Sequence, residues 1–191
     1  MSLKPFAHAG ARFAANAGIG VDTTSGESVE QVTSALAPIR HDFSVALWTP
    51  GNPFAVGAVI RVAHNFLARE IFIVGTAPFY AKASMGMHKY ETIVELTDHR
   101  DLLRAVGKRP VWAIEKDHAR RSLYGTKPFP PDVVFVFGSE RFGLPAEVLA
   151  RADDVVGIPV YGINHSLPLA VASGILMSEW ARRHYADGAA F

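Results

Sequence analysis

The chain has 191 residues, of which 49% are hydrophobic and 19% charged, with a formal net charge of +1. This composition indicates a globular protein that is long enough for one sizeable domain, and it excludes a disordered tail. The absence of cysteine excludes disulfide bonds, thiolate metal sites and cysteine nucleophiles. No metal site is expected, because no pair of histidines has HExxH-like spacing near a carboxylate.

The N-terminal region is expected to be an extension without an assigned role, covering residues 1–40. A short helix is predicted in it from Ser28 to Leu36. Residues 1–20 interrupt their alanines with Asn16 and glycines, so they lack the apolar stretch of a signal peptide. No stretch reaches the roughly 18 consecutive apolar residues of a membrane span. We therefore expect a cytoplasmic protein without a membrane partner.

From about residue 41 the pattern changes to short apolar strands that alternate with helices. Thr97 is expected to cap the second of these helices. The alternation predicts an α/β domain over residues 41–191, with a parallel sheet covered by helices on both faces. The expected strands are 43–48, 70–74, 111–114, 133–137 and 155–160, and the expected helices are 55–68, 98–106, 145–150 and 166–185.

Three loops with glycine and polar residues directly follow predicted strands. They cover residues 51–57, 138–143 and 161–167. In parallel sheets, ligands bind outside the carboxyl ends of the strands. The sequence therefore predicts a functional site at this edge of the sheet.

The last predicted helix is apolar on nearly all sides. Leu169, Leu176 and Trp180 share one face, while Ala170 and Met177 share another. Such a helix needs cover on more than its core side. We expect a partner subunit to provide that cover.

Glu140 comes two residues after Gly138, at the end of an apolar strand. Two interpretations stay open for the carboxylate: it accepts backbone N–H groups at the start of the next helix, or it serves a functional site. Gly138 either lets a planar ligand approach the backbone or only permits a tight turn.

Arg61 is expected in the middle of a helix among apolar neighbours, where an arginine requires a partner. That partner is either a carboxylate at the edge of the core or an anionic ligand. Ser166 is placed to cap the last helix. His165 is either a general base or a hydrogen-bonded structural residue, and no adjacent carboxylate suggests a triad.

A local surplus of basic residues lies between positions 104 and 127. It either binds a phosphate backbone or forms a solvated loop face. Its acidic members are Glu115 and Asp117, and its basic members are Arg104, Lys108, Arg109, Lys116, Arg120, Arg121 and Lys127.

The three glycine-containing loops together resemble a known family. They read Asn52-Pro-x-x-x-Gly57-x-x-x-Arg61, then Val136-Phe-Gly138-Ser-Glu140-x-x-Gly143-Leu-Pro145, then Ile158-Pro159-x-x-Gly162-x-x-x-Ser166-Leu167. Their order, spacing and strand-then-loop context resemble the three motifs of the SpoU (TrmH-like) branch of the SPOUT RNA methyltransferases. The resemblance covers roughly residues 43–183.

The resemblance implies the SPOUT α/β knot, in which the C-terminal part threads a deep trefoil knot, and a homodimer with the active site at the subunit interface. It implies S-adenosylmethionine as cofactor and methyl transfer to a ribose 2′-hydroxyl of tRNA or rRNA. RNA contact would come from the basic segment 104–127 and the partner subunit.

The resemblance also implies roles for single residues. Arg61 would face the phosphate of the target nucleotide and help remove the hydroxyl proton, and Glu140 would position Arg61. Asn52 and Ser166 complete the catalytic set. The cofactor would contact the backbone near Ile114, Gly138, Ile158, Ser166 and Leu167.

Two positions depart from the motifs. Ala55 and Pro168 stand where the family has asparagines, and Asn52 or Asn164 are candidates to replace them in space. Two hypotheses therefore stay open: an active ribose 2′-O-methyltransferase, and a knotted RNA-binding or cofactor-binding protein with weak or altered catalysis. A nucleotide-binding oxidoreductase is disfavoured, because no GxGxxG follows a strand.

Overall fold

A parallel sheet forms the centre of the protein. The computed structural model describes residues 28–49, 52–125, 128–140, 142–164 and 166–185. Within these residues, seven strands lie in the order β3-β2-β1-β6-β4-β7-β5, and every neighbouring pair is parallel. The strands are β1 (Ser44–Trp48), β2 (Ile71–Val74), β3 (Ile93–Leu96), β4 (Val111–Ile114), β5 (Arg121–Ser122), β6 (Val134–Phe137) and β7 (Asp154–Gly157).

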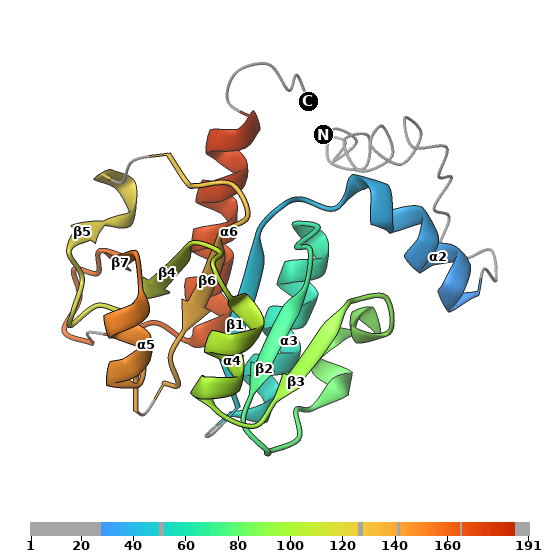
Figure 1. Ribbon diagram of the computed structural model, residues 1–191, viewed down its shortest axis with the longest axis horizontal. Coiled ribbons are helices and arrows are strands. Elements are labelled where there is room, and N and C mark those ends of the chain that lie inside the picture. The colour runs from blue at the N-terminus through green and yellow to red at the C-terminus, as the bar shows by residue number, and fades with distance from the viewer. Residues whose placement is uncertain (1–27, 50–51, 126–127, 141, 165, 186–191) are drawn as a thin grey trace.

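Helices cover both faces of the sheet (Figure 1). α3 (Pro53–Asn65) and α6 (Leu169–Tyr185) pack on one face, and α4 (His99–Val106) and α5 (Ala146–Arg151) pack on the other. The helix α2 (Val29–Leu36) precedes β1 and lies to one side of the sheet. Short 3₁₀ turns are η1 (Ala37–Ile39), η2 (Ala81–Ser84), η3 (Met87–Lys89) and η4 (Leu123–Gly125). The predicted α/β class with a parallel sheet is confirmed.

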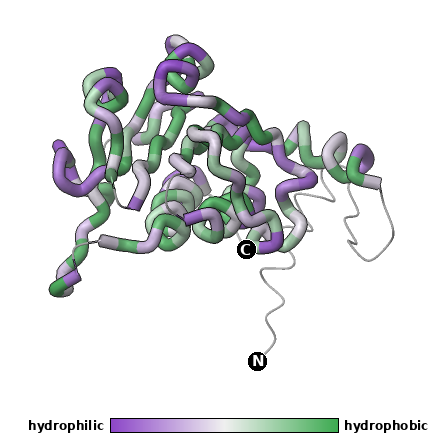
Figure 2. Tube along the Cα trace, turned by 90° about the horizontal axis from the view of Figure 1, so that it is seen from below, coloured by the Kyte–Doolittle hydropathy of each residue, from purple (hydrophilic) through white to green (hydrophobic). Residues whose placement is uncertain are grey.

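Two apolar layers hold the helices to the sheet. In β1, Val45 and Leu47 pack toward α3 and α6, whereas Ala46 packs toward α4 and α5. Because both faces are covered, the central strands read as unbroken apolar runs in the sequence. In Figure 2, the hydrophobic stretches run mainly through the interior, and hydrophilic stretches lie mostly in outer turns.

The boundaries of several elements differ from the predictions. β3 and β5 were not predicted, because β3 is only partly buried and includes the exposed Glu95, and β5 is an exposed Arg-Ser pair. Asp98, and not Thr97, caps α4, since its Oδ1 accepts from the backbone N–H groups of Arg100 (2.8 Å) and Asp101 (3.0 Å). The strand predicted to reach residue 160 ends at Gly157.

α6 begins three residues later than predicted, at Leu169. Its first turn is closed by the carbonyl of Pro168, which accepts from the backbone N–H groups of Val171 (2.9 Å) and Ala172 (3.0 Å). Most of the cover of α6 comes from its own chain. Gly174 approaches Val62 of α3, and Trp180 is buried.

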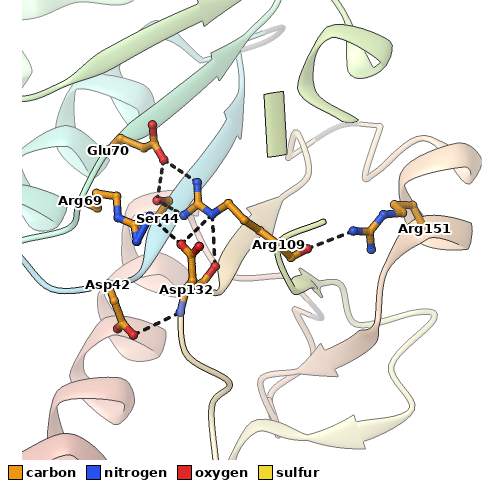
Figure 3. Close-up of polar contacts among 7 residues, drawn as sticks. All are labelled: Asp42, Ser44, Arg69, Glu70, Arg109, Asp132 and Arg151. Atoms are coloured by element: carbon orange, nitrogen blue, oxygen red, sulfur yellow. Dashed lines mark hydrogen bonds and ion pairs between the residues drawn. The ribbon is translucent and has the colours of Figure 1, made fainter. Parts of the chain in front are cut away.

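A polar network closes the edge formed by the amino ends of the strands (Figure 3). Arg109 lies at its centre: its guanidinium pairs with Glu70 and Asp132 and donates to the hydroxyl of Ser44. Asp132 Oδ1 lies 2.7 Å from both Arg109 Nε and a guanidinium nitrogen of Arg69. Arg151 donates to the carbonyl of Arg109 at 3.0 Å. This edge is therefore held together by ion pairs between protein groups, and among the described residues Asp132 Oδ1 takes part through charge pairing without a hydrogen bond.

A second ion pair ties the segment before β1 to the sheet. Arg40 donates to both carboxylate oxygens of Glu91, at 2.7 and 3.1 Å, and the Glu91 side chain is fully buried. His64, near the end of α3, also lies 2.7 Å from Glu91. Residue 40, the last of the predicted extension, is thus fixed to the core. Within the described residues, no helix combines the length and the apolar character needed to span a membrane.

Candidate active site

A cleft of about 540 Å³ opens at the carboxyl ends of β4, β6 and β7. Its volume falls within the range of small-molecule sites, about 300–1,000 Å³. The carboxyl edge of a parallel sheet is also the expected place for a ligand. The wall consists of residues 114–118, 137–140, 142–144, 158, 160, 166, 167, 169 and 172.

The cleft brings together most of the residues that the sequence singled out. Glu140 and Ser166, two of the four predicted catalytic residues, lie in its wall. Asn52 lies outside the wall but contacts Glu140. Arg61 also lies outside the wall, and it does not contact Glu140 within the described residues. All five residues that were predicted to contact a cofactor line the cleft: Ile114, Gly138, Ile158, Ser166 and Leu167.

The loop after β6 is a tight turn closed by its own backbone. Ser139 and Gly143 exchange two backbone hydrogen bonds, of 3.0 and 3.1 Å. A Cβ atom on Gly138 would lie 2.4 Å from the carbonyl carbon of Gly143. Gly143 itself has φ +63°. Of the two interpretations of Gly138, the structure therefore favours the tight turn, because the turn by itself requires glycine there.

Glu140 links the three motif loops. Its Oε1 accepts from the backbone N–H of Leu169 at 3.1 Å, and its Oε2 accepts from Asn52 Nδ2 at 3.3 Å. Glu140 thus accepts a backbone N–H at the start of a helix, as one of the two interpretations predicted. The helix is α6, however, and not the next helix along the chain, α5. Asn52 also caps α3, since its Oδ1 accepts from the N–H of Ala55 at 3.1 Å.

Arg61 is exposed, which contradicts the expectation that it lies among buried residues. The buried face of α3 includes Val56, Val59, Ile60 and Ala63, and at about 100° per residue Arg61 falls outside it. Within the described part of this chain, Arg61 forms neither an ion pair nor a hydrogen bond with Glu140. Arg61 is nine residues from Asn52, a distance of about 13 Å along the helix axis.

Ser166 belongs to a turn and does not cap α6. Its backbone N–H and its hydroxyl both donate to Asn164 Oδ1, at 3.2 and 3.1 Å. Asn164 is therefore engaged in this turn, and Asn52 is the asparagine that reaches Glu140. His165, which the sequence left as a general base or a structural residue, lies outside the described residues.

Within the described residues, part of the basic segment 104–127 is neutralised by acidic partners. Arg104 pairs with Asp101, Arg121 pairs with Asp154 at 2.9 Å, and Arg109 lies in the network at the opposite edge of the sheet. These pairs reduce the charge available for a phosphate backbone and favour the alternative of a solvated face.

Four cleft residues were not predicted to belong to the site: Glu115, Lys116, Asp117 and His118. They directly follow β4, just as Gly138 and Glu140 follow β6, so the rule of strand ends could have found them. Among the described residues, no three His, Asp or Glu side chains gather in a way that could hold a metal ion.

Comparison with known proteins assigns the family. Residues 42–178 match the model of the SpoU rRNA Methylase family. The chain belongs to this family. It is 30% identical to the 23S rRNA (guanosine-2′-O-)-methyltransferase RlmB of Ralstonia nicotianae over 138 residues. This alignment covers 69% of this chain and 55% of that relative. This SpoU chain thus spans about half the length of that relative.

Two further similarities extend over more of the SpoU chain. The tRNA (guanosine(18)-2′-O)-methyltransferase of Thermus thermophilus is 28% identical over 168 residues, which are 84% of this chain and 83% of that protein. The solved structure of an AdoMet-bound rRNA methyltransferase from Sinorhizobium meliloti superposes with a TM-score of 0.66 at 30% identity, over 78% of this chain and 60% of that one. The parallel α/β fold therefore matches SpoU methyltransferase structures.

Proposed function

We propose that the protein is an S-adenosylmethionine-dependent RNA methyltransferase that methylates a ribose 2′-hydroxyl of tRNA or rRNA. The observation that carries this proposal is the convergence of three distant loops on Glu140, a residue in the wall of the cleft. Asn52 of the first loop and the N–H of Leu169, just after the third, both bind the Glu140 carboxylate of the second. The similar proteins named above are 2′-O-methyltransferases of 23S rRNA and tRNA, which supports the same reaction here.

The cleft has the chemistry to hold the cofactor. Ile114, Ile158 and Leu167 offer apolar surface to a flat adenine ring, and Glu115 and Ser139 offer polar groups to its hydroxyl and amino substituents. When bound, S-adenosylmethionine supplies a methyl group that its sulfonium already activates. The protein's own task is to align the ribose hydroxyl and ease the departure of its proton.

We assign these tasks to two groups of residues. Glu140 is a positioning residue that holds Asn52 and the first turn of α6 beside the cleft. Arg61 is the cation that orients the nucleotide phosphate and assists proton removal. Because Arg61 is exposed and stands outside the cleft of its own chain, Arg61 of the partner subunit has to complete the site.

A homodimer is supported by the surface around the cleft. The side chains of Phe142 (71% exposed), Tyr161 (95%) and Ile163 (97%) stand in solvent on the two loops that line the mouth. Val171 on α6 is also 47% exposed. Large apolar side chains gathered in this way are typical of a surface that binds another protein. We propose that a second copy of the chain covers them.

We also propose that the chain consists of an extension at residues 1–40 and a methyltransferase domain at residues 41–191. Within this domain, we propose a C-terminal trefoil knot. Near the end of α6, Arg183 donates to the carbonyl of Leu123 at 2.7 Å and its guanidinium lies 4.8 Å from the Phe129 ring centre. The helix therefore contacts the connection between β4 and β6, which is the loop that a C-terminal knot would thread. We also propose a cytoplasmic location, which tRNA or rRNA as the substrate supports.

A second candidate follows from Ala55 and Pro168, which replace motif asparagines. It is a knotted RNA-binding or cofactor-binding protein with weak or altered catalysis. The contact of Asn52 with Glu140 favours an active enzyme, because an asparagine amide still reaches the central carboxylate. Pro168 leaves α6 intact, since it precedes the helix and contributes its carbonyl to the first turn.

Incubation with methyl-labelled S-adenosylmethionine and separate tRNA and rRNA pools tests the proposal. After digestion to nucleosides, we expect label in 2′-O-methylated ribose from one of the two pools. Label on a base would overturn the assignment to ribose. Tight binding of S-adenosylhomocysteine without any transfer would instead support the second candidate.

A further inference from the structure

We infer that Glu115 binds the ribose hydroxyls of the cofactor. This inference rests on the proposed function and adds a residue that lies outside the three motifs. Glu115 is the first residue after β4, and its backbone N–H donates to the carbonyl of Val156 in β7 at 3.1 Å. The base of the side chain is therefore fixed between two central strands, at the wall of the cleft.

The carboxylate of Glu115 spans two walls of the cleft. Its Oε2 atom lies 2.9 Å from the position that a Cβ atom would take on Gly143, so it lies against the backbone of the loop after β6. A side chain at position 143 would displace this carboxylate. The carboxylate consequently lies where the loops after β4 and β6 meet.

Within the described residues, this carboxylate is short of donors. Its Oε1 accepts one long hydrogen bond, from the backbone N–H of Asp117 at 3.3 Å. Neither lysine nor arginine pairs with it there, because Lys116 pairs with Asp117 instead, at 3.5 Å. A half-buried carboxylate with open acceptor sites is stabilised by a ligand that brings O–H or N–H donors.

Glu140, the other carboxylate of the wall, differs in this respect. Both of its oxygens already accept hydrogen bonds from protein groups, Leu169 N–H and Asn52 Nδ2. Glu115 is thus the carboxylate that remains available to a ligand.

The position of Glu115 favours the ribose over the rest of the cofactor. Ile114, its neighbour in the chain, provides apolar wall together with Ile158 and Leu167. An adenine ring that binds this apolar surface carries its ribose one bond away, within reach of the next side chain. A carboxylate that accepts from both hydroxyls of a ribose is the arrangement by which many dinucleotide sites hold a nucleoside.

Calorimetric titration with S-adenosylhomocysteine and its 2′,3′-dideoxy analogue tests the inference. For Glu115→Gln and Glu115→Ala, we expect the affinity for S-adenosylhomocysteine to fall about 10- to 100-fold, as for loss of hydrogen bonds to a charged group. For the dideoxy analogue, the variants and the unmodified protein should differ by less than about threefold, because the hydroxyls that Glu115 binds are absent.

Glu95→Gln is the matched control. It removes one carboxylate from the exposed edge strand β3, away from the cleft, and should leave both affinities unchanged. Thermal melting checks that each variant is folded.

Each other outcome overturns the inference in a distinct way. An equal loss of affinity for S-adenosylhomocysteine, its dideoxy analogue and 5′-methylthioadenosine would show that Glu115 shapes the loop and does not bind the hydroxyls. A loss that persists with the dideoxy analogue but disappears with 5′-methylthioadenosine would assign the carboxylate to the amino group of the cofactor. If the unmodified protein bound neither ligand, the proposed cofactor itself would be wrong, whereas normal binding by Glu115→Gln would contradict only the role of Glu115.

Discussion

The two edges of the sheet differ in how their charges are satisfied. At the amino edge, Arg109 pairs with both Glu70 and Asp132, and Ser44 completes the network. At the carboxyl edge, Glu140 binds backbone and amide groups, and Glu115 keeps acceptor sites that no described residue fills, beside a cleft. The same strands thus end in a closed ion-pair network on one side and an open site on the other. We therefore expect the amino edge to contribute mainly to stability and the carboxyl edge to contribute mainly to function.

The largest expected effect lies at the open edge. Arg61→Ala should lower methyl transfer about 100- to 10,000-fold, the usual contribution of a group that assists proton transfer. Because Arg61 is exposed and outside its own cleft, affinity for S-adenosylhomocysteine should change less than about twofold. Arg100→Ala, which removes an exposed arginine on α4, is the control and should retain activity. Loss of cofactor affinity in Arg61→Ala would show that Arg61 contributes to cofactor binding and does not act on the nucleotide alone.

Mixing two inactive variants shows whether that edge is completed by a second subunit. Arg61→Ala is combined with Leu167→Trp, which fills the cleft. After random exchange, half of the dimers are mixed and each has one intact site, so activity should recover to about a quarter of that of the unmodified protein. No recovery, with exchange verified, would mean that Arg61 and the cleft of one site come from the same chain.

The closed edge should affect stability and leave the cleft unaffected. Arg109→Ala removes the guanidinium partner of Glu70 and leaves Asp132 with Arg69 alone. Because the Arg109 side chain is only 15% exposed, the substitution should lower the free energy of unfolding by about 2–4 kcal/mol. Arg104→Ala removes a surface pair with a 78% exposed arginine and should cost about 0.5 kcal/mol or less. Urea denaturation measures both. A normal stability with lost affinity for S-adenosylhomocysteine would show that the edges are not independent.

The smallest expected effect is a pH dependence at the far end of α6. Hydrogen bonds from Arg182, and then from Arg183, lower the pKa of Glu179 from 4.5 to about 2, although burial opposes this shift. Since the pKa is lower in the folded state, the stabilisation is complete above pH 4.5 and is lost as the pH falls toward 2. Because Arg182 is exposed, the stabilisation by the ion pairs of Glu179 is limited to about 1 kcal/mol.

Glu179→Gln provides the comparison for this effect. Its free energy of unfolding should decline less steeply than that of the unmodified protein between pH 4.5 and 2. Parallel declines of the two proteins would show that the ion pairs of Glu179 contribute no net stability.

Much of the fold could be predicted from apolar runs and caps. The strands at the centre of the sheet were found because burial on both faces makes them apolar throughout, as in Val134–Phe137. The edge strands β3 and β5 were not predicted, because β3 is partly exposed and β5 consists of two exposed residues. Thr97 and Asp98 are both good caps, and only the backbone geometry shows that Asp98 is used.

The site was predictable where position along a strand decides it. Ile114, Gly138 and Ile158 line the cleft because each stands at or next to the carboxyl end of a strand. Contacts between distant loops are a different matter. The pairing of Glu140 with Asn52 and Leu169 depends on how three loops pack, and no local pattern encodes it. The exposure of Arg61 was mistaken because apolar neighbours in sequence lie on another face of the helix.

A crystal structure of the protein grown with S-adenosylhomocysteine tests the central claim most directly. We expect density for the ligand at the carboxyl edge, between the loops that begin at Ile114, Gly138 and Ile158. We also expect an arginine of a second subunit at the mouth of the cleft. A ligand bound elsewhere, or an empty cleft under saturating ligand, would contradict it.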